Sequence, residues 1–181
     1  MQENCCGGLL FMGAKVQSCA ITGLQGTLIE VEVEIADGCA ALTVVGLSFA
    51  ASCALKERVC SAITSSDYSF PHKRIMVNLT PVDLRKGGPA YDLPIVIGIL
   101  LASGQINAAV QSASHLYLGA LFPDGSVRHI PGILPMVAWA QEKQIKTVFV
   151  PVADAREAAL MQGVAIYLSC RDAWSTHCAS Q

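Results

Sequence analysis

The chain has 181 residues, of which 52% are hydrophobic and only 14% are charged, and its formal net charge is −2 at pH 7. This length favours a single domain that can bury a full core without disulfide bonds. Because the charged fraction lies well below the ~25% of typical soluble domains, we expect apolar faces that a homo-oligomer or a neighbouring domain covers. The slightly acidic balance excludes a generally basic surface, so any DNA contact must be local.

Residues 1–11 lack the basic start of a signal peptide, and we interpret them as an N-terminal extension or cloning remnant ahead of a domain at 12–178. Strands are then predicted at 15–22, 26–37 and 42–47. In the second strand, three glutamates alternate with apolar residues, which predicts one solvated and one buried face. A cation site formed by these glutamates is the less favoured alternative. Asp37-Gly38 predicts a hairpin turn between the second and third strands.

A helix is predicted at 50–65, with Leu55, Val59 and Ile63 on its core face and Lys56 and Arg58 on other faces. Cys53 and Cys60 are seven residues apart, which places both near one face, and we assign them to the core as well. The eight cysteines of the chain include no Cys-x-x-Cys pair, and we expect no disulfides in a cytoplasmic protein.

The segment from Asn78 to Pro94 predicts a strand end, a glycine-rich loop and the start of a helix. The strand is predicted at 72–79 and the helix at 92–103, with Asp92 as the N-cap and Pro94 in the first turn. Backbone N–H groups at such a start can bind an anion or oxyanion, although the loop can also be a purely structural turn. The P-loop pattern Gly-x-x-x-x-Gly-Lys-Ser/Thr occurs nowhere in the chain, so we expect no bound ATP here.

The last third of the chain predicts alternating strands and helices. Pro123 to Ser126 is a strong hairpin signal. Cys170, His177 and Cys178 match no zinc spacing, and no apolar run is long enough to span a membrane, so we predict neither a metal site nor a membrane partner. The whole pattern predicts an α/β fold, an α+β two-layer sandwich. The remaining predicted strands are 117–121, 127–130, 147–150 and 164–168, and the remaining helices are 133–143, 154–161 and 171–177.

The run Thr80 to Pro94, TPVDLRKGGPAYDLP, resembles the signature of the N-terminal domain of magnesium-chelatase-related AAA+ ATPases, the family of YifB and the competence protein ComM. Segments in the first three strands and the first helix agree, and the resemblance covers residues 12–178. It implies a Lon-protease-domain-like, ribosomal-protein-S-five domain-two-like fold, similar also to the C-terminal domain of the recombination protein RadA. The motif positions are Pro81, Asp83, Leu84, Tyr91, Asp92 and Pro94.

Lon proteases use a serine and a lysine as a catalytic dyad. The resemblance places the serine position on Ala90 and the lysine position on Leu134. A methyl group cannot attack a carbonyl, and a leucine cannot accept a proton, so we predict no catalytic residues. A peptidase with a relocated nucleophile, using Thr80, Ser103 or Lys86, remains the enzymatic alternative, together with a chelatase accessory subunit.

The resemblance implies a non-catalytic N-terminal module of a ComM-like helicase or branch-migration factor. Its AAA+ motor, absent from this chain, would hold ATP and Mg and form a hexamer. The module would serve ring assembly and would contact single-stranded or branched DNA. We predict phosphate contacts from two basic pairs and the adjacent loop backbone, although ordinary surface charge is the alternative. These candidates are Lys73, Arg74, Arg85, Lys86, Gly87 and Gly88.

Overall fold

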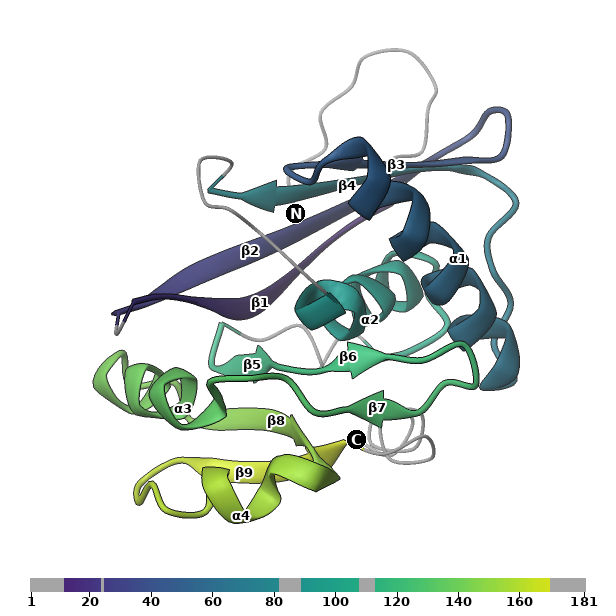
Figure 1. Ribbon diagram of the computed structural model, residues 1–181. Helices are drawn as coiled ribbons and strands as arrows, with labels where there is room; N and C mark the ends of the chain where they lie inside the picture. Colours follow the sequence, from purple (N-terminus) through teal and green to yellow (C-terminus); the bar gives the residue numbers. More distant parts are fainter. Residues whose placement is uncertain (1–11, 24, 82–88, 108–112, 170–181) are drawn as a thin grey trace.

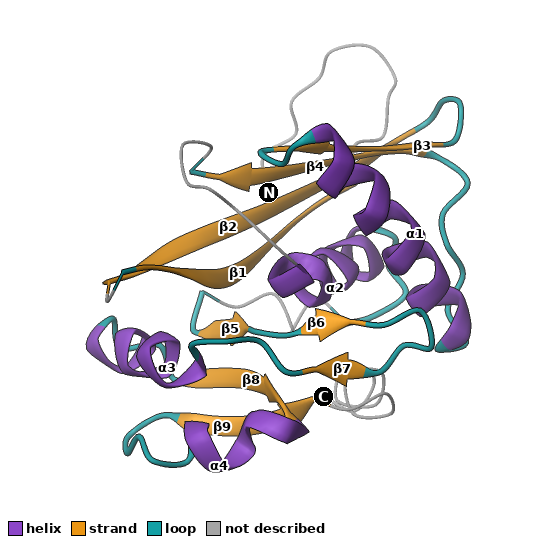
Figure 2. Cartoon of the chain, viewed as in Figure 1, coloured by secondary structure: helices purple, strands orange, loops and turns teal. Residues whose placement is uncertain are grey.

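The computed structural model describes residues 12–23, 25–81, 89–107 and 113–169 (Figure 1). Within these ranges the chain forms a four-stranded sheet, a three-stranded sheet and a two-stranded ribbon, with helices packed on the two larger sheets (Figure 2). This arrangement confirms the predicted α+β sandwich. Several predicted features lie outside the described residues: the cysteines 5, 6, 170 and 178, the helix at 171–177, and the loop residues Asp83, Leu84, Arg85, Lys86, Gly87 and Gly88.

The four-stranded sheet has the order β1-β2-β4-β3. Its strands are β1 (Met12–Thr22), β2 (Gln25–Ala36), β3 (Ala41–Val45) and β4 (Arg74–Thr80). The pairs β1–β2 and β2–β4 are antiparallel, and β3 pairs in parallel with β4. The predicted hairpin at Asp37-Gly38 is therefore wrong, because β4 lies between β2 and β3. A parallel β3–β4 pair requires a long crossover, and helix α1 (Phe49–Ser65) supplies it.

The two faces of β2 differ as the alternation predicts. Val31 and Val33 are completely buried in the main core cluster. On the opposite face Glu34 is exposed, Glu30 and Glu32 are partly exposed, and Glu32 pairs with Lys15 at 2.5 Å. This confirms a solvated face. Among the described residues, no group of three or more His, Cys, Asp or Glu side chains could hold a metal ion.

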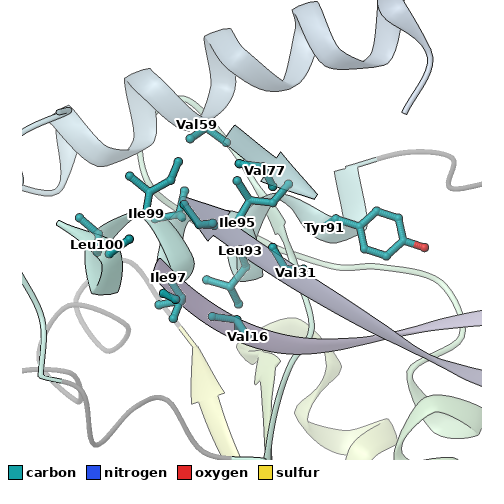
Figure 3. Packing of buried hydrophobic residues seen from close by; sticks show 14 of the residues in the cluster. Val16, Val31, Val59, Val77, Tyr91, Leu93, Ile95, Ile97, Ile99 and Leu100 are labelled. Atoms are coloured by element: carbon teal, nitrogen blue, oxygen red, sulfur yellow. The ribbon is translucent and has the colours of Figure 1, made fainter. Parts of the chain in front are cut away.

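Helices α1 and α2 (Asp92–Ala102) cover the inner face of this sheet, and all residues of α2 except Leu101 are buried (Figure 3). Close packing explains a glycine in the middle of α2. A Cβ on Gly98 would lie 2.6 Å from Cγ2 of Val33, so a side chain at this position would collide with the sheet. Helix α2, which follows the motif segment in the sequence, is therefore surrounded by core residues.

The second sheet has the parallel order β5-β8-β9, with strands β5 (His115–Tyr117), β8 (Thr147–Pro151) and β9 (Ala165–Ser169). Helices α3 (Ile133–Glu142) and α4 (Ala155–Ala158) pack against it, with the short helix η3 (Val152–Asp154) before α4. These two helices and the sheet share a second, smaller apolar cluster.

The predicted strand at 117–121 is divided in two. Its first part is β5, and its second part, β6 (Ala120–Leu121), forms a separate antiparallel ribbon with β7 (Val127–Arg128). Gly119 lies at the break with φ of 153°, and a Cβ there would lie 2.6 Å from Cγ1 of Val127. The ribbon closes through Gly125, whose φ is 81°, which confirms the predicted hairpin.

The core assignment of two cysteines is wrong. Cys53 and Cys60 do share a face of α1, but both are exposed, whereas Leu55 and Val59 face the core. The error has a physical reason, because at about 100° per residue the face shared by the two cysteines lies about 110° around the helix from the core face. The described cysteines are free thiols. No helix in the described ranges combines the length and the apolar character needed to cross a bilayer.

Candidate functional site

The motif that points to function surrounds the start of α2. Strand β4 ends at Thr80. The next described element is the short helix η1 (Pro89–Tyr91), which leads directly into α2. Ala90, to which the resemblance assigns the dyad serine position, is partly buried against the second apolar cluster. Tyr91 is 4% exposed. The framework around the serine position is therefore packed, and the side chain at that position is a methyl group.

Asp92 is not the N-cap that the sequence predicts. Tyr91 occupies the cap position without a side-chain capping hydrogen bond, and Asp92 is the first residue of the helix. The carboxylate of Asp92 is fully buried and accepts hydrogen bonds from Arg58, from Nε at 2.6 Å and from Nη2 at 3.0 Å. The two carboxylate oxygens of Asp92 therefore accept from Arg58 on α1, whereas in an N-cap they would accept from backbone N–H groups of α2.

The Arg58–Asp92 pair joins α1 to the start of α2. Burial raises the pKa of Asp92, while the hydrogen bonds and charge of Arg58 and the Leu121 backbone N–H oppose this rise. The hydrogen bond to Asp92 raises the pKa of Arg58. The fork of a guanidinium and a carboxylate forms a directional, charge-assisted contact. We infer that this pair fixes the start of α2 relative to α1, and it is the main site feature that sequence reasoning missed.

Leu134, to which the resemblance assigns the dyad lysine position, is held by a different part of the chain. Leu134 lies in the first turn of α3, and its backbone N–H donates to Oε1 of Glu157 at 2.9 Å. Four residues earlier, the N–H of Ile130 donates to Oδ2 of Asp154 at 3.3 Å. Asp154 is 3% exposed and also pairs with Nδ1 of His129. Two carboxylates from η3 and α4 thus anchor the segment that carries Leu134, and no signal in the local sequence links them to it.

No activated thiol borders this site in the described part of the chain. Cys19, in the second apolar cluster, is 1% exposed, and burial raises its pKa to about 12. Its thiol is therefore neutral near pH 7 and is a poor nucleophile. The nearby hydroxyl of Ser18 is also buried and donates to the backbone oxygen of Tyr117 at 3.0 Å. Both side chains are therefore buried parts of the packing rather than accessible nucleophiles.

Of the two basic pairs, only Lys73 and Arg74 lie in the described part of the chain. Lys73 pairs with Asp37 at 2.8 Å, and its side chain is 53% exposed. Arg74 is exposed at the first position of β4, whereas the chain leaves β4 toward the loop after Thr80. Arg74 and Thr80, at the two ends of β4, are about 20 Å apart along the extended strand. The second pair, Arg85 and Lys86, lies outside the described residues, so the structure places only the first pair.

Comparison with known proteins identifies the family. The family model of subunit ChlI of Mg-chelatase matches residues 31–154, more than half of the chain. The chain is 36% identical over 160 residues to the competence protein ComM of Haemophilus influenzae, covering 86% of this chain and 30% of that protein. It is 36% identical over 166 residues to the uncharacterized protein YifB of Salmonella typhimurium, covering 92% and 32% of the two chains.

A third relative, the uncharacterized protein YifB of Escherichia coli, is 37% identical over 148 residues, which cover 82% of this chain and 29% of that protein. The chain thus spans about 30% of the length of the relatives it matches. The resemblance inferred from the motif is confirmed at the level of family. The extent of the family match shows that this chain belongs to the Mg-chelatase-related family of subunit ChlI.

Proposed function

We propose that this chain is a non-catalytic N-terminal module of a magnesium-chelatase-related AAA+ ATPase that acts on DNA in the manner of a ComM-like helicase or branch-migration factor. One observation supports the proposal: Ala90 and Leu134, to which the resemblance assigns the dyad positions, carry only apolar side chains, and their surroundings are packed and hydrogen-bonded. A packed framework without a nucleophile or a base suits assembly and contact rather than covalent chemistry.

The partners follow from the proposal. The motor domain would bind ATP and Mg and would drive a hexameric ring in the cytoplasm, and this module would contribute to the ring. The relative from Haemophilus influenzae is named a competence protein, and we propose that this chain serves a related process. DNA would be contacted through local basic residues, of which Arg74 is exposed and Lys73 is half exposed.

Fluorescence anisotropy with labelled single-stranded and branched DNA, between ~50 and ~200 mM salt, tests DNA contact. We expect binding that weakens steeply with salt and is lost in Lys73→Ala/Arg74→Ala or in Arg85→Ala/Lys86→Ala. Lys143→Ala/Lys146→Ala, which removes two exposed lysines from around the end of α3, is the matched control. No binding at the lowest salt would refute DNA contact by this module and leave ring assembly as its role.

A further inference from the structure

The outer side of α1 carries an exposed aromatic ring, two exposed cysteines and one pair of opposite charges, of which Lys56 is partly exposed. Its inner side packs on α2, as Val59 shows in Figure 3, and α1 lies at the margin of the molecule in Figure 1. Phe49 is 86% exposed, the most exposed of the large hydrophobic side chains in the described part of the chain. Residues spaced by three, four or seven positions follow one face of a helix. We call this face the α1 stripe: Phe49, Cys53, Lys56, Glu57, Cys60 and Thr64.

The α1 stripe is complementary to itself when it is reversed. If a two-fold axis passes between Lys56 and Glu57, each Lys56 faces Glu57 of a second copy. The same axis places Cys53 opposite the second copy's Cys60 and Phe49 opposite the second copy's Thr64. An isologous interface requires this property, because one patch must match its own image.

We propose that the α1 stripe is a two-fold interface that binds a second copy of this chain, with the two α1 helices antiparallel. Small side chains at Cys53, Cys60 and Thr64 allow the helices to approach to the 8–10 Å of ordinary helix packing. Contact removes the exposed ring of Phe49 from water, and two reciprocal Lys56–Glu57 pairs set the register. Arg58 does not compete for this role, because it turns inward to Asp92.

This contact goes beyond the proposed ring. An isologous contact closes on two copies, whereas a ring requires a heterologous contact that repeats around an axis. The α1 stripe would therefore pair two modules, within or between assemblies, by a surface separate from the ring contact. A failure of ring assembly or of DNA binding would leave this proposal standing, and a failure of pairing would leave the proposed function standing.

Sedimentation equilibrium of the 181-residue chain tests the charge pairing. We expect a dimer for the unchanged chain and a dissociation constant at least about tenfold weaker for Lys56→Glu or Glu57→Lys, since each change creates two like-charge contacts. The doubly exchanged chain, Lys56→Glu/Glu57→Lys, restores both attractive pairs and should dimerise as the unchanged chain does. A monomeric unchanged chain, or a double exchange that fails to restore the dimer, would overturn the proposal.

A second pair of variants tests the aromatic contact. Phe49→Asp should abolish the dimer without harming the fold, because an acidic residue is favourable in the first turn of a helix. Leu160→Asp is the matched control, since Leu160 is 70% exposed and lies beyond α4 rather than on α1. The dimer must survive Leu160→Asp. Equal dimerisation of both variants, with unchanged circular dichroism, would contradict the proposed surface.

Disulfide trapping tests the direction of the helices. Under copper-phenanthroline and air, the antiparallel arrangement should join Cys53 of one copy to Cys60 of the other, as read by peptide mapping of the covalent dimer. Cys53→Ser and Cys60→Ser should each prevent this link. A Cys53–Cys53 link that persists in Cys60→Ser would show a parallel pair and overturn the antiparallel register.

Discussion

Asp92 and Arg58, separated by 34 positions in the sequence, form an ion pair with two hydrogen bonds, in which the Asp92 side chain is completely buried and the Arg58 side chain is 27% exposed. The pair ties the crossover helix α1 to the first residue of α2, directly after the motif loop. A contact of this kind determines position more than it adds stability, because burying two charges costs about as much as their attraction returns.

Removal of one partner should be costly, and removal of both should not. Arg58→Leu leaves the Asp92 carboxylate buried without a partner, and we expect it to lower the free energy of unfolding by about 3 kcal/mol. Arg58→Leu/Asp92→Leu should recover most of that loss, which urea unfolding of the single and double variants will measure. Lys146→Leu, at an exposed position, is the control. Additive losses in the double variant would show that the pair is not coupled.

The packing of α2 on β2 predicts that substitutions at Gly98 and Val33 have non-additive effects on the free energy of unfolding. Gly98→Ala places a methyl group against Val33 and should lower the free energy of unfolding by about 1–3 kcal/mol through overpacking. In a Val33→Ala background the same change has room, and its cost should fall below about 0.5 kcal/mol. Gly13→Ala, on the open side of β1, is the control because the nearest atom to a Cβ there is 3.9 Å away. An equal cost in both backgrounds would contradict the contact.

Patterns of short range in the sequence were sufficient for much of the fold. Alternation along β2 predicts which side of that strand is buried, and the residues from Pro123 to Ser126 predict the β6–β7 ribbon. The order of strands could not be predicted in this way, because Asp37-Gly38 is compatible with a hairpin and the insertion of β4 depends on long-range pairing. The break at Gly119 likewise depends on a contact with Val127, across the ribbon.

In the candidate site as well, short-range sequence patterns could be predicted and long-range contacts could not. The family motif can be identified from the sequence, since it needs only residue types in order, whereas the assignment of Ala90 and Leu134 to the dyad positions stays a prediction. The partner of Asp92 cannot be identified in this way, because a helix start with an aspartate predicts a cap and nothing near it indicates Arg58. The face of Cys53 could have been predicted correctly, because at about 100° per residue Cys53 and Cys60 lie about 110° around the helix from Leu55, Val59 and Ile63.

The buried thiol of Cys19 predicts a specific sensitivity to alkali. Burial raises its pKa from 9.0 to about 12, so the unfolded chain releases this proton at lower pH than the folded chain. The stability that depends on the neutral thiol is complete below pH 9 and is lost as the pH rises toward 12, by at most about 4 kcal/mol. Unfolding measured across this range should show a shallower decline in Cys19→Ala. Cys39→Ala, at an exposed thiol, should keep the steep decline, and identical slopes for both would refute the assignment.

The chain should lack peptidase activity of the Lon type. Ala90 offers no nucleophile, Leu134 offers no base, and the backbone N–H at Leu134 is already bonded to Glu157. We therefore expect no cleavage of casein or of fluorogenic peptides above a buffer blank, with or without ATP, and no labelling by a fluorophosphonate. The purified chain and its Thr80→Ala variant should behave alike in these assays, because Thr80 is an exposed strand end and not an activated hydroxyl. Specific cleavage that disappears in Thr80→Ala would establish a relocated nucleophile and reject the non-catalytic assignment.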